Sequence, residues 1–390
     1  MTVKSALVKL SNLFKFIISL LIIFIIRLKK NKILTGTLLI IRLDAIGDYV
    51  LFRNFLEVVR NSEPFGKYNI TLCGNIIWRD LAEEFDSDFV DTFIWIDRRK
   101  FSNNFFYRYK ILKSIYIMGF ETAVDTTYSR EILFGDSIIR ASNAQLRIGS
   151  SGALDKHAKW KRDLLSDKYY TKLINTTRDN VFEFYRNKEF FEKFLVEKIS
   201  LQKPSITKEL NEPALHLTNT YIVLFPGSRQ KNKIWSYKNF ISVINFILEN
   251  SLSDIVIVGS EMESDIANNI VRNINDTRIR NLTGQTKLSS LPSIIRSAEL
   301  LITNESLAVH LAASVDTKFI CVSNGERFGR FHPYPEEIFD AGYYVYPPQI
   351  MTHINNPEKL SELYRSQSNL DINLIKPDDV IKQIPNVLGR

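Results

Sequence analysis

Three short segments of the chain place side chains that could do chemistry directly after apolar runs. The first is IIRLDAIGDYVLF, residues 40–52, in which Asp44 and Asp48 flank Gly47. We expect Gly47 to allow a tight turn after a buried strand and Asp48 to stand at the start of the following helix. An aspartate there can cap the helix, or it can take a proton from a hydroxyl group as a general base. The single glycine is not the GxGxxG pattern of a dinucleotide site, so the segment does not indicate a dehydrogenase.

The second segment, FPGSRQKNKIW, covers residues 225–235. It puts a glycine and Ser228 after a strand and then three cations, Arg229, Lys231 and Lys233. Free backbone N–H groups beside cations suit a diphosphate. The alternative is a solvated basic loop that binds no ligand.

The third segment, LITNESLAVHLAAS, covers residues 301–314. It ends a strand at Asn304 and begins a helix near Ser306. A helix N-terminus that carries a hydroxyl group is a ready anion site. His310 lies one turn further along, and taken alone such a histidine is more often a buried core residue than a catalytic one. Asn304 and Glu305 have an equally simple role as helix caps.

These segments need a scaffold that exposes the ends of strands. Short apolar runs alternate with helical patterns in both halves of the chain, which predicts βαβ units and parallel sheets. The runs cover residues 37–43, 68–73, 92–96, 121–127 and 144–149, and then 220–229, 253–260, 298–304 and 317–323. Ligands of such sheets bind at the carboxyl ends of strands, where all three segments fall. We expect domains at residues 37–210 and 211–390, joined by a polar link around Pro204 and Pro213, with residues 150–208 largely helical.

Residues 1–36 differ in composition from the rest of the chain. They hold seven basic residues and no acidic one, whereas all 390 residues have a net charge of +8. Their apolar run, Phe16–Ile26, is eleven residues long, short of the ~20 that span a bilayer as a helix. This composition favours a helix lying on an anionic membrane surface over a nucleic-acid-binding face.

Three other interpretations of this segment remain open: a tilted membrane span, a helix packed on its own protein, and a cleaved signal peptide. We expect deletion of residues 1–32 to release the protein from membranes and to leave its fold intact. The two cysteines, Cys73 and Cys321, stand far apart without a histidine cluster. This excludes a disulfide framework and a structural zinc site and indicates a reducing compartment.

Taken in this order, the three segments resemble glycosyltransferase family 9, the ADP-heptose lipopolysaccharide heptosyltransferases. The resemblance runs from about Thr37 to the chain end. It is carried by LLIIRLDAIGDYVL, AVDTTYSREILFGDSIIRASNAQLRIG, PGSRQKNKIWSYKNF, VIVGSEMESDIA, NLTGQTKLSSLPSIIRSAELLITNESLAVHLAA and PDDVIKQIPNVL. It implies the α/β GT-B fold, in which two Rossmann-like domains face each other across a cleft. The first domain would hold mainly the acceptor and the second the nucleotide sugar. In front of them, the composition of residues 1–36 predicts an N-terminal membrane-associated helix.

The resemblance also implies an activity and roles for single residues. The expected reaction is an inverting, metal-independent transfer of heptose or a related sugar from a nucleotide diphosphate donor, ADP-heptose being the family's donor, with no bound cofactor. Asp48 matches the catalytic base, with Asp44 and Gly47 as orienting residues, and Lys233 matches the residue that binds the leaving diphosphate. The other matched donor-binding positions are Ser228, Arg229, Glu263, Glu305, Ser306 and His310, of which Glu263 would hold a ribose.

The implied acceptor is lipopolysaccharide or another envelope glycan, and no nucleic acid partner is expected. We expect the protein to lie on the cytoplasmic face of the inner membrane, peripheral or monotopic, and the composition of residues 1–36 predicts that it is bound through that segment.

Two positions depart from the family pattern. Glu305 replaces an aspartate, and Leu307 replaces a glycine that lets the backbone approach the phosphate. Residues 156–172 match no family motif. Three alternatives therefore stay open: the same chemistry with a donor other than heptose, a degenerate relative that binds a glycolipid or a partner, and a nucleotide-sugar epimerase of similar architecture.

Overall fold

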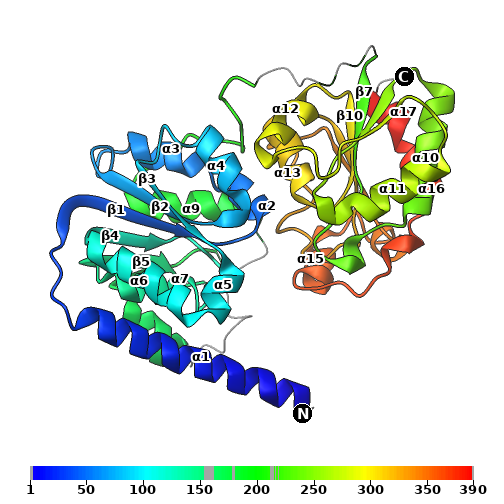
Figure 1. The fold of residues 1–390 in the computed structure, drawn as a ribbon. Coiled ribbons are helices and arrows are strands. Elements are labelled where there is room, and N and C mark those ends of the chain that lie inside the picture. The colour runs from blue at the N-terminus through cyan, green and yellow to red at the C-terminus, as the bar shows by residue number, and fades with distance from the viewer. Residues whose placement is uncertain are drawn as a thin grey trace. The chain divides into compact units, whose positions relative to one another are not determined.

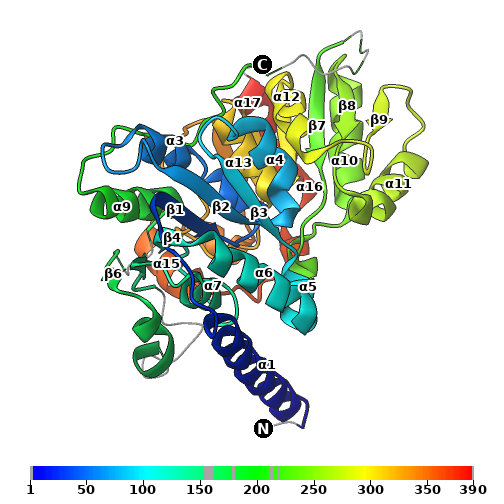
Figure 2. The same cartoon turned by 60° about the vertical axis from the view of Figure 1, so that its left-hand side comes forward.

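The computed structural model describes residues 3–152, 162–177, 181–210, 215, 217 and 219–388. The chain divides into two compact units: Met1–Arg178 with Arg186–Ser200, and Asp179–Tyr185 with Leu201–Arg390 (Figures 1 and 2). Each unit is built on a six-stranded sheet in which every pair of neighbouring strands is parallel. Residues 156–161 and Pro213, for which the sequence provided expectations, lie outside the described residues.

The sheet of the first unit has the order β3-β2-β1-β4-β5-β6. Its strands are β1 (Leu34–Arg42), β2 (Asn69–Asn75), β3 (Thr92–Ile96), β4 (Phe120–Asp125), β5 (Leu146–Ser150) and β6 (Lys172–Ile174). From β1 the chain proceeds outward through β2 and β3, and it then returns to the other side of β1 with β4. The carboxyl ends of β1 and β4 therefore form a topological switch point, the place where ligands bind in such sheets.

Helices cover both faces of this sheet. They are α1 (Val3–Arg27), α2 (Ile46–Val50), α3 (Asn54–Asn61), α4 (Arg79–Phe85), α5 (Arg98–Asn103), α6 (Phe105–Met118), α7 (Gly135–Ser142) and α9 (Glu183–Leu195). Helices α1, α6 and α7 pack together on one core, and α3 meets α9 where the rings of Phe55 and Phe191 stack with centroids 5.0 Å apart.

The second unit repeats this topology with the order β12-β11-β10-β7-β8-β9. Its strands are β7 (Tyr221–Phe225), β8 (Asp254–Ile257), β9 (Ile279–Asn281), β10 (Leu300–Asn304), β11 (Phe319–Val322) and β12 (Gly342–Val345). Its helices are α10 (Tyr237–Asn250), α11 (Ser264–Asn273), α12 (Leu291–Arg296), α13 (Leu307–Ser314), α14 (Pro348–Met351), α15 (Pro357–Tyr364), α16 (Pro377–Ile381) and α17 (Gln383–Leu388). Its switch point lies between β7 and β10.

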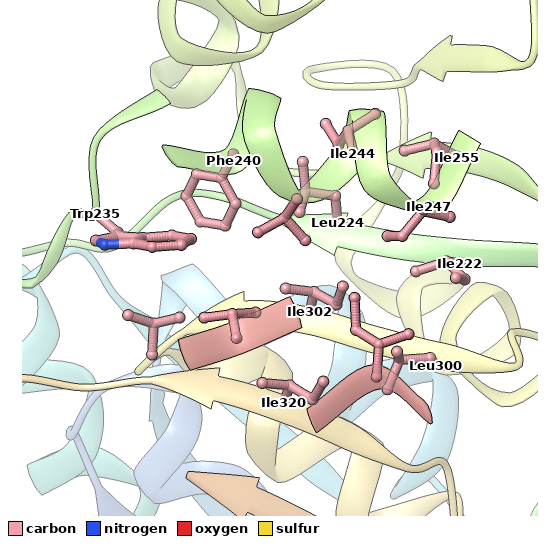
Figure 3. Packing of buried hydrophobic residues seen from close by; sticks show 14 of the residues in the cluster. Ile222, Leu224, Trp235, Phe240, Ile244, Ile247, Ile255, Leu300, Ile302 and Ile320 are labelled. Atoms are coloured by element: carbon pink, nitrogen blue, oxygen red, sulfur yellow. The ribbon is translucent and has the colours of Figure 1, made fainter. Parts of the chain in front are cut away.

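The core of the second unit fills the space between α10 and the sheet (Figure 3). Phe240 and Ile244 of α10 face Leu224 of β7 and Ile302 of β10 across this core, and all four are buried. Trp235 is fully buried and donates a hydrogen bond from Nε1 to the Ile375 carbonyl at 3.0 Å. The segment that leads from β7 to α10 is therefore anchored at its far end.

Every strand predicted from an apolar run is present, and three strands were missed. The missed strands are β6, β9 and β12, each three or four residues long and each at an edge of its sheet. These three edge strands bury few of their side chains, so they do not stand out as apolar runs, whereas the edge strand β3 has the five-residue apolar run TFIWI. The predicted turn at Gly47 is wrong, because Gly47 lies inside α2 and has no positive φ.

Helix α1 is longer than its apolar run and is partly core. The stretch Leu10–Arg27 is long and apolar enough to span a membrane by length and composition. Yet Ile22, Ile23 and Ile26 are buried in the core shared with α6 and α7, and Ser19 Oγ accepts hydrogen bonds from the Arg108 guanidinium at 2.9 and 3.2 Å. The N-terminal turns project beyond the rest of the unit (Figures 1 and 2). The expectation that this segment is dispensable for folding is therefore not supported.

We expect Ile23→Ala to lower the unfolding free energy of the first unit by about 2–4 kcal/mol, because it empties part of a packed core. Ile23 is 2% exposed, whereas its neighbour Phe24 is 65% exposed. Phe24→Ala should therefore change the unfolding free energy by no more than ~0.5 kcal/mol. Pulse proteolysis in urea measures both. Equal effects of the two substitutions would show that α1 does not pack on the unit.

Candidate functional site

The predicted donor residues of the second unit gather at its switch point. The loop after β7 carries Ser228, Arg229 and Lys233, and the loop after β10 carries Glu305 and Ser306. Because β7 and β10 are neighbouring parallel strands, their carboxyl ends lie at the same edge of the sheet. The structure thus unites residues that are more than seventy positions apart in the chain.

Asn304 holds these two loops together. Its side chain is fully buried; Nδ2 donates to the Pro226 carbonyl at 2.5 Å, and Oδ1 accepts from the Trp235 backbone N–H at 3.2 Å. Both ends of the loop between β7 and α10 are therefore tied to the end of β10. The helix-cap role proposed for Asn304 is wrong, since Ser306 is the N-cap of α13.

An ion pair between Lys233 and Glu305 lies at the centre of the site. Lys233 Nζ donates to Glu305 Oε1 at 2.7 Å, and Lys233 is only 7% exposed. On its other side, Glu305 Oε2 accepts from Ser323 Oγ at 2.9 Å and lies 3.2 Å from His332 Nε2. Burial would raise the pKa of the Glu305 carboxyl, but the charges and hydrogen bonds of His332 and Lys233 outweigh it and hold that pKa at about 2.

Glu326 is a second acid beside the same lysine. Its Oε1 lies 3.6 Å from Lys233 Nζ, and its backbone carbonyl lies 2.8 Å from His332 Nε2. Glu326, His332 and Ser323 all follow β11, the strand next to β10. None of these three residues was predicted from the sequence. The signal that could have found Ser323 and Glu326 is the phrase VSNGER, polar residues and an acid directly after a predicted strand, whereas His332 lies beyond that phrase.

Ser228 and Arg229 have different environments. Ser228 Oγ donates to the Glu305 backbone carbonyl at 3.4 Å, which places its hydroxyl beside the ion pair. Arg229 is exposed, and none of the carboxylates in the described part of the chain lies within 4.0 Å of it. An exposed cation at the rim of the site is available to a charged ligand.

Ser306 and His310 lie on consecutive turns at the start of α13. Ser306 Oγ accepts from the Ala308 backbone N–H at 3.2 Å. His310 is buried, and its Nδ1 lies 2.9 Å from the Tyr334 hydroxyl. Burial lowers the pKa of the His310 imidazole to about 4. The histidine is therefore neutral near pH 7, and its geometry fits the packed core histidine raised as the simpler interpretation.

Glu263 reaches the site from the next loop. Its Oε2 accepts from the Ser260 backbone N–H at 2.8 Å and from Ser260 Oγ at 2.5 Å, which forms a capping box. A Cβ on Gly227 would meet Glu263 Cγ at 2.1 Å, so only glycine lets Glu263 lie against the end of β7. Oε1 of Glu263 has no hydrogen bond to any described residue.

The predicted base of the first unit lies at the other switch point. Asp48 is in the first turn of α2, directly after β1, and is partly exposed. The N-cap of α2 is Ala45, so the interpretation of Asp48 as an N-cap is wrong. Asp44 pairs with the buried Arg42, Nε to Oδ2 at 3.0 Å, and its backbone carbonyl accepts from Trp78 Nε1 at 3.2 Å. These contacts fix the turn that carries Asp48.

Asp125, at the end of β4, is a further acid at this switch point that was not predicted from the sequence. It is fully buried, and burial together with the nearby charge of Asp136 raises the pKa of its carboxyl to about 7. Asp125, Asp44 and Thr127 line one small pocket. In the described part of the chain, no three His, Cys, Asp or Glu side chains group as metal ligands.

We expect the imidazole of His310 to titrate near pH 4, well below its usual range, in an NMR titration of the five histidines. A histidine whose pKa falls on folding stabilises the protein fully above its unfolded pKa of 6.5, and this stabilisation is lost as the pH falls towards 4. His310→Gln identifies the signal and should weaken the loss of stability between pH 6.5 and 4. Titration of this signal near 6.5 would contradict the buried, neutral assignment.

Comparison with known proteins identifies the family. A family model described as glycosyltransferase family 9 (heptosyltransferase) matches residues 138–357, more than half of the chain. Lipopolysaccharide heptosyltransferase 3 of Escherichia coli (strain K12) is 25% identical over 217 residues. That match covers 54% of this chain and 62% of the relative, so less than two thirds of the relative's length is matched.

Solved structures match nearly the whole fold. A glycosyl transferase family 9 protein from Veillonella parvula DSM 2008 aligns with a TM-score of 0.68 at 18% identity, covering 91% of this chain and 97% of that one. E. coli ADP-heptose lps heptosyltransferase II aligns with a TM-score of 0.63 at 13% identity, covering 90% and 98%. These matches confirm the expected α/β GT-B fold of two Rossmann-like units. Because the family model spans more than half of the chain, the chain belongs to glycosyltransferase family 9.

Proposed function

We propose that the protein is an inverting, metal-independent glycosyltransferase that moves a heptose or related sugar from a nucleotide diphosphate donor to lipopolysaccharide or another envelope glycan. The observation that carries this proposal is the buried Lys233, paired with Glu305 at the switch point of the second unit. The proposal is supported by the matched relatives, which are named lipopolysaccharide heptosyltransferase 3 and ADP-heptose lps heptosyltransferase II.

Lys233 would bind the diphosphate of the donor. An ammonium group has three donors, and Lys233 uses one on Glu305, so others remain for phosphate oxygens. Ser228 lies beside it, the N-terminus of α13 begins at the same edge, and the exposed Arg229 adds charge at the rim. As the bond between the sugar and the diphosphate breaks, negative charge grows on the leaving diphosphate, and these groups would stabilise it. The free Oε1 of Glu263 would accept a hydrogen bond from a ribose hydroxyl.

Asp48 would act as the general base on the acceptor. Its carboxylate takes the proton of an acceptor hydroxyl, the hydroxyl oxygen forms a bond to the anomeric carbon, and the bonding electrons of the donor leave with the diphosphate. Attack opposite the leaving group inverts the anomeric centre. The position of Asp48 supports this role, because it is partly exposed at a switch point and is not used as a helix cap.

The two family departures favour one alternative, a donor other than heptose. Glu305 is one methylene longer than the family's aspartate and reaches both Lys233 and His332. Leu307, the first residue of α13, adds a side chain where the family has none. Both changes alter the space around the diphosphate and the sugar, so the donor sugar must be determined by assay. We place the protein on the cytoplasmic face of the inner membrane, bound peripherally through α1, whose outer side exposes Leu13, Phe14 and Phe24.

We expect Asp48→Asn to lower the rate of transfer about 100- to 10,000-fold while donor binding is retained, because only the proton acceptor is removed. The assay screens a panel of nucleotide sugars, ADP-heptose included, for binding and for transfer or slow hydrolysis. Asp88→Asn removes an exposed carboxylate elsewhere on the same unit and should leave the rate unchanged. Turnover by Asp48→Asn at the wild-type rate would rule out Asp48 as the base. Failure of every nucleotide sugar to bind would favour the degenerate relative.

We expect Lys233→Met to lower kcat roughly 100- to 1,000-fold, as for the loss of one group that stabilises developing charge. It should also lower the unfolding free energy by about 3 kcal/mol, because Glu305 then loses its paired cation. The double variant Lys233→Met/Glu305→Gln removes both charges and should regain most of the stability but none of the activity. Recovery of activity in the double variant would show that the lysine only neutralises Glu305.

A further inference from the structure

A cavity of about 410 Å³ lies in the first unit beside the N-terminal helix. Four cations line it: Arg27, Arg140, Arg147 and Lys168. The rest of the lining is mainly apolar and consists of Phe16, Leu20, Leu164, Leu165 and Tyr169. The lining residues come from α1, from the end of α7, from the start of β5 and from the turns at residues 162–169. This is the amino edge of the sheet, whereas Asp48 follows the carboxyl end of β1.

The arginines of this cavity are close together and have no acidic partner among the residues that the structure describes. Arg27 Nη2 donates to the Arg140 carbonyl at 2.6 Å, Arg140 Nη1 donates to the Tyr169 hydroxyl at 2.9 Å, and Arg147 Nε donates to the Tyr169 carbonyl at 2.6 Å. Across the described residues, no carboxylate lies within 4.0 Å of Arg27, Arg140, Arg147 or Lys168. Burial and the charges of Arg140 and Arg147 lower the pKa of the Arg27 guanidinium. Clustered cations without a counter-charge favour an anionic ligand.

The helix that forms one wall has three distinct sides. Successive residues of an α-helix are ~100° apart, so Phe16, Leu20 and Arg27 share the side that faces the cavity. On one flank is the buried side with Ile23 and Ile26, and on the other is an exposed side. The exposed side carries large apolar residues: Leu10, Leu13, Phe14, Ile17, Leu21, Phe24, Ile25 and Leu28. A ligand with an anionic head and an apolar tail could place its head among the cations of the cavity and its tail against this exposed apolar side.

We propose that this cavity binds the phosphate headgroup of an anionic phospholipid while the acyl chains lie along the exposed side of α1. Arginine guanidinium groups bind phosphate oxygens through paired N–H donors. The leucines and phenylalanine of the wall would contact the glycerol and the upper acyl chain. A soluble anion would make no use of these apolar side chains. The inference rests on the membrane association proposed above and is independent of the sugar transfer, whose assay uses no lipid bilayer.

The test uses the full chain with a fluorophore at the cavity mouth. The native Cys73 and Cys321 are buried, so Leu164→Cys can be labelled selectively with bimane. Titration with phosphatidylcholine vesicles that contain phosphatidylglycerol should shift the bimane emission to the blue. Vesicles of the same surface potential that carry oleate in place of phosphatidylglycerol should bind at least several-fold more weakly and shift the emission little.

The decisive variant is Arg27→Gln/Lys168→Gln, which removes two exposed cations of the cavity. Each basic residue near an anionic membrane surface strengthens binding about 5-fold. We therefore expect the loss of both cations to weaken binding to phosphatidylglycerol vesicles about 30-fold. The matched control, Lys67→Gln/Lys238→Gln, removes two exposed cations that do not line the cavity and should leave binding within a few-fold of wild type. Lys168→Gln alone, expected to weaken binding about 5-fold, keeps the test valid if the double variant does not fold.

Three outcomes would overturn the proposal. Equal losses of vesicle affinity in the cavity variant and the control variant would mean that the vesicles attract the protein through its overall surface charge and not through the cavity. An emission shift with inorganic phosphate or glycerol phosphate equal to that with vesicles would assign the cavity to a soluble anion. Binding to oleate vesicles as tight as to phosphatidylglycerol vesicles would show that the protein does not recognise the phosphate group of the lipid. Sugar transfer that persists in any of these cases would leave the proposed enzyme activity untouched.

Discussion

The second unit is organised around the need to neutralise a buried lysine. Lys233 is 7% exposed, and a charge taken out of water to that extent requires a close counter-charge. Glu305 supplies this counter-charge, with its Oε1 2.7 Å from Lys233 Nζ. Opposite unit charges ~4 Å apart attract each other by about 4 kcal/mol at the effective dielectric constant of a protein. The pair also fixes geometry, because its members stand on different loops. Asn304 then ties both ends of the lysine loop to β10.

The same constraint gives the site its chemical character. Glu305 is held ionised by Lys233 and His332, so the site is set with fixed charges before any ligand arrives. Fixed charges need little rearrangement when charge develops on a leaving group, which is how preorganised sites lower a barrier. The two units repeat one topology, and each places its acids or cations at the switch point of a parallel sheet. The base proposed in one unit and the diphosphate site proposed in the other would be the two parts that sugar transfer needs.

Much of this arrangement could be predicted because strand ends leave a clear pattern. Central parallel strands are buried on both faces, so β1, β7 and β10 appear as apolar runs, and the polar residues that follow mark the site. The contribution of β11 could not be predicted in the same way. His332 lies ten positions beyond that strand and reaches Glu305 only through the fold of the intervening loop. The three sides of α1 were also hidden, since nearly all of its residues from 16 to 26 are apolar and the pattern does not tell core from surface.

The central claim is that the second unit binds the diphosphate of a nucleotide sugar at the Lys233–Glu305 pair. Hydrogen–deuterium exchange of the wild-type chain with and without ADP tests it most directly, because the readout is local and requires neither an acceptor nor turnover. We predict slower amide exchange in peptides that cover residues 226–235, 259–263 and 304–310, with little change in the first unit. Unchanged exchange in these peptides at saturating ADP, or protection confined to the first unit, would contradict it.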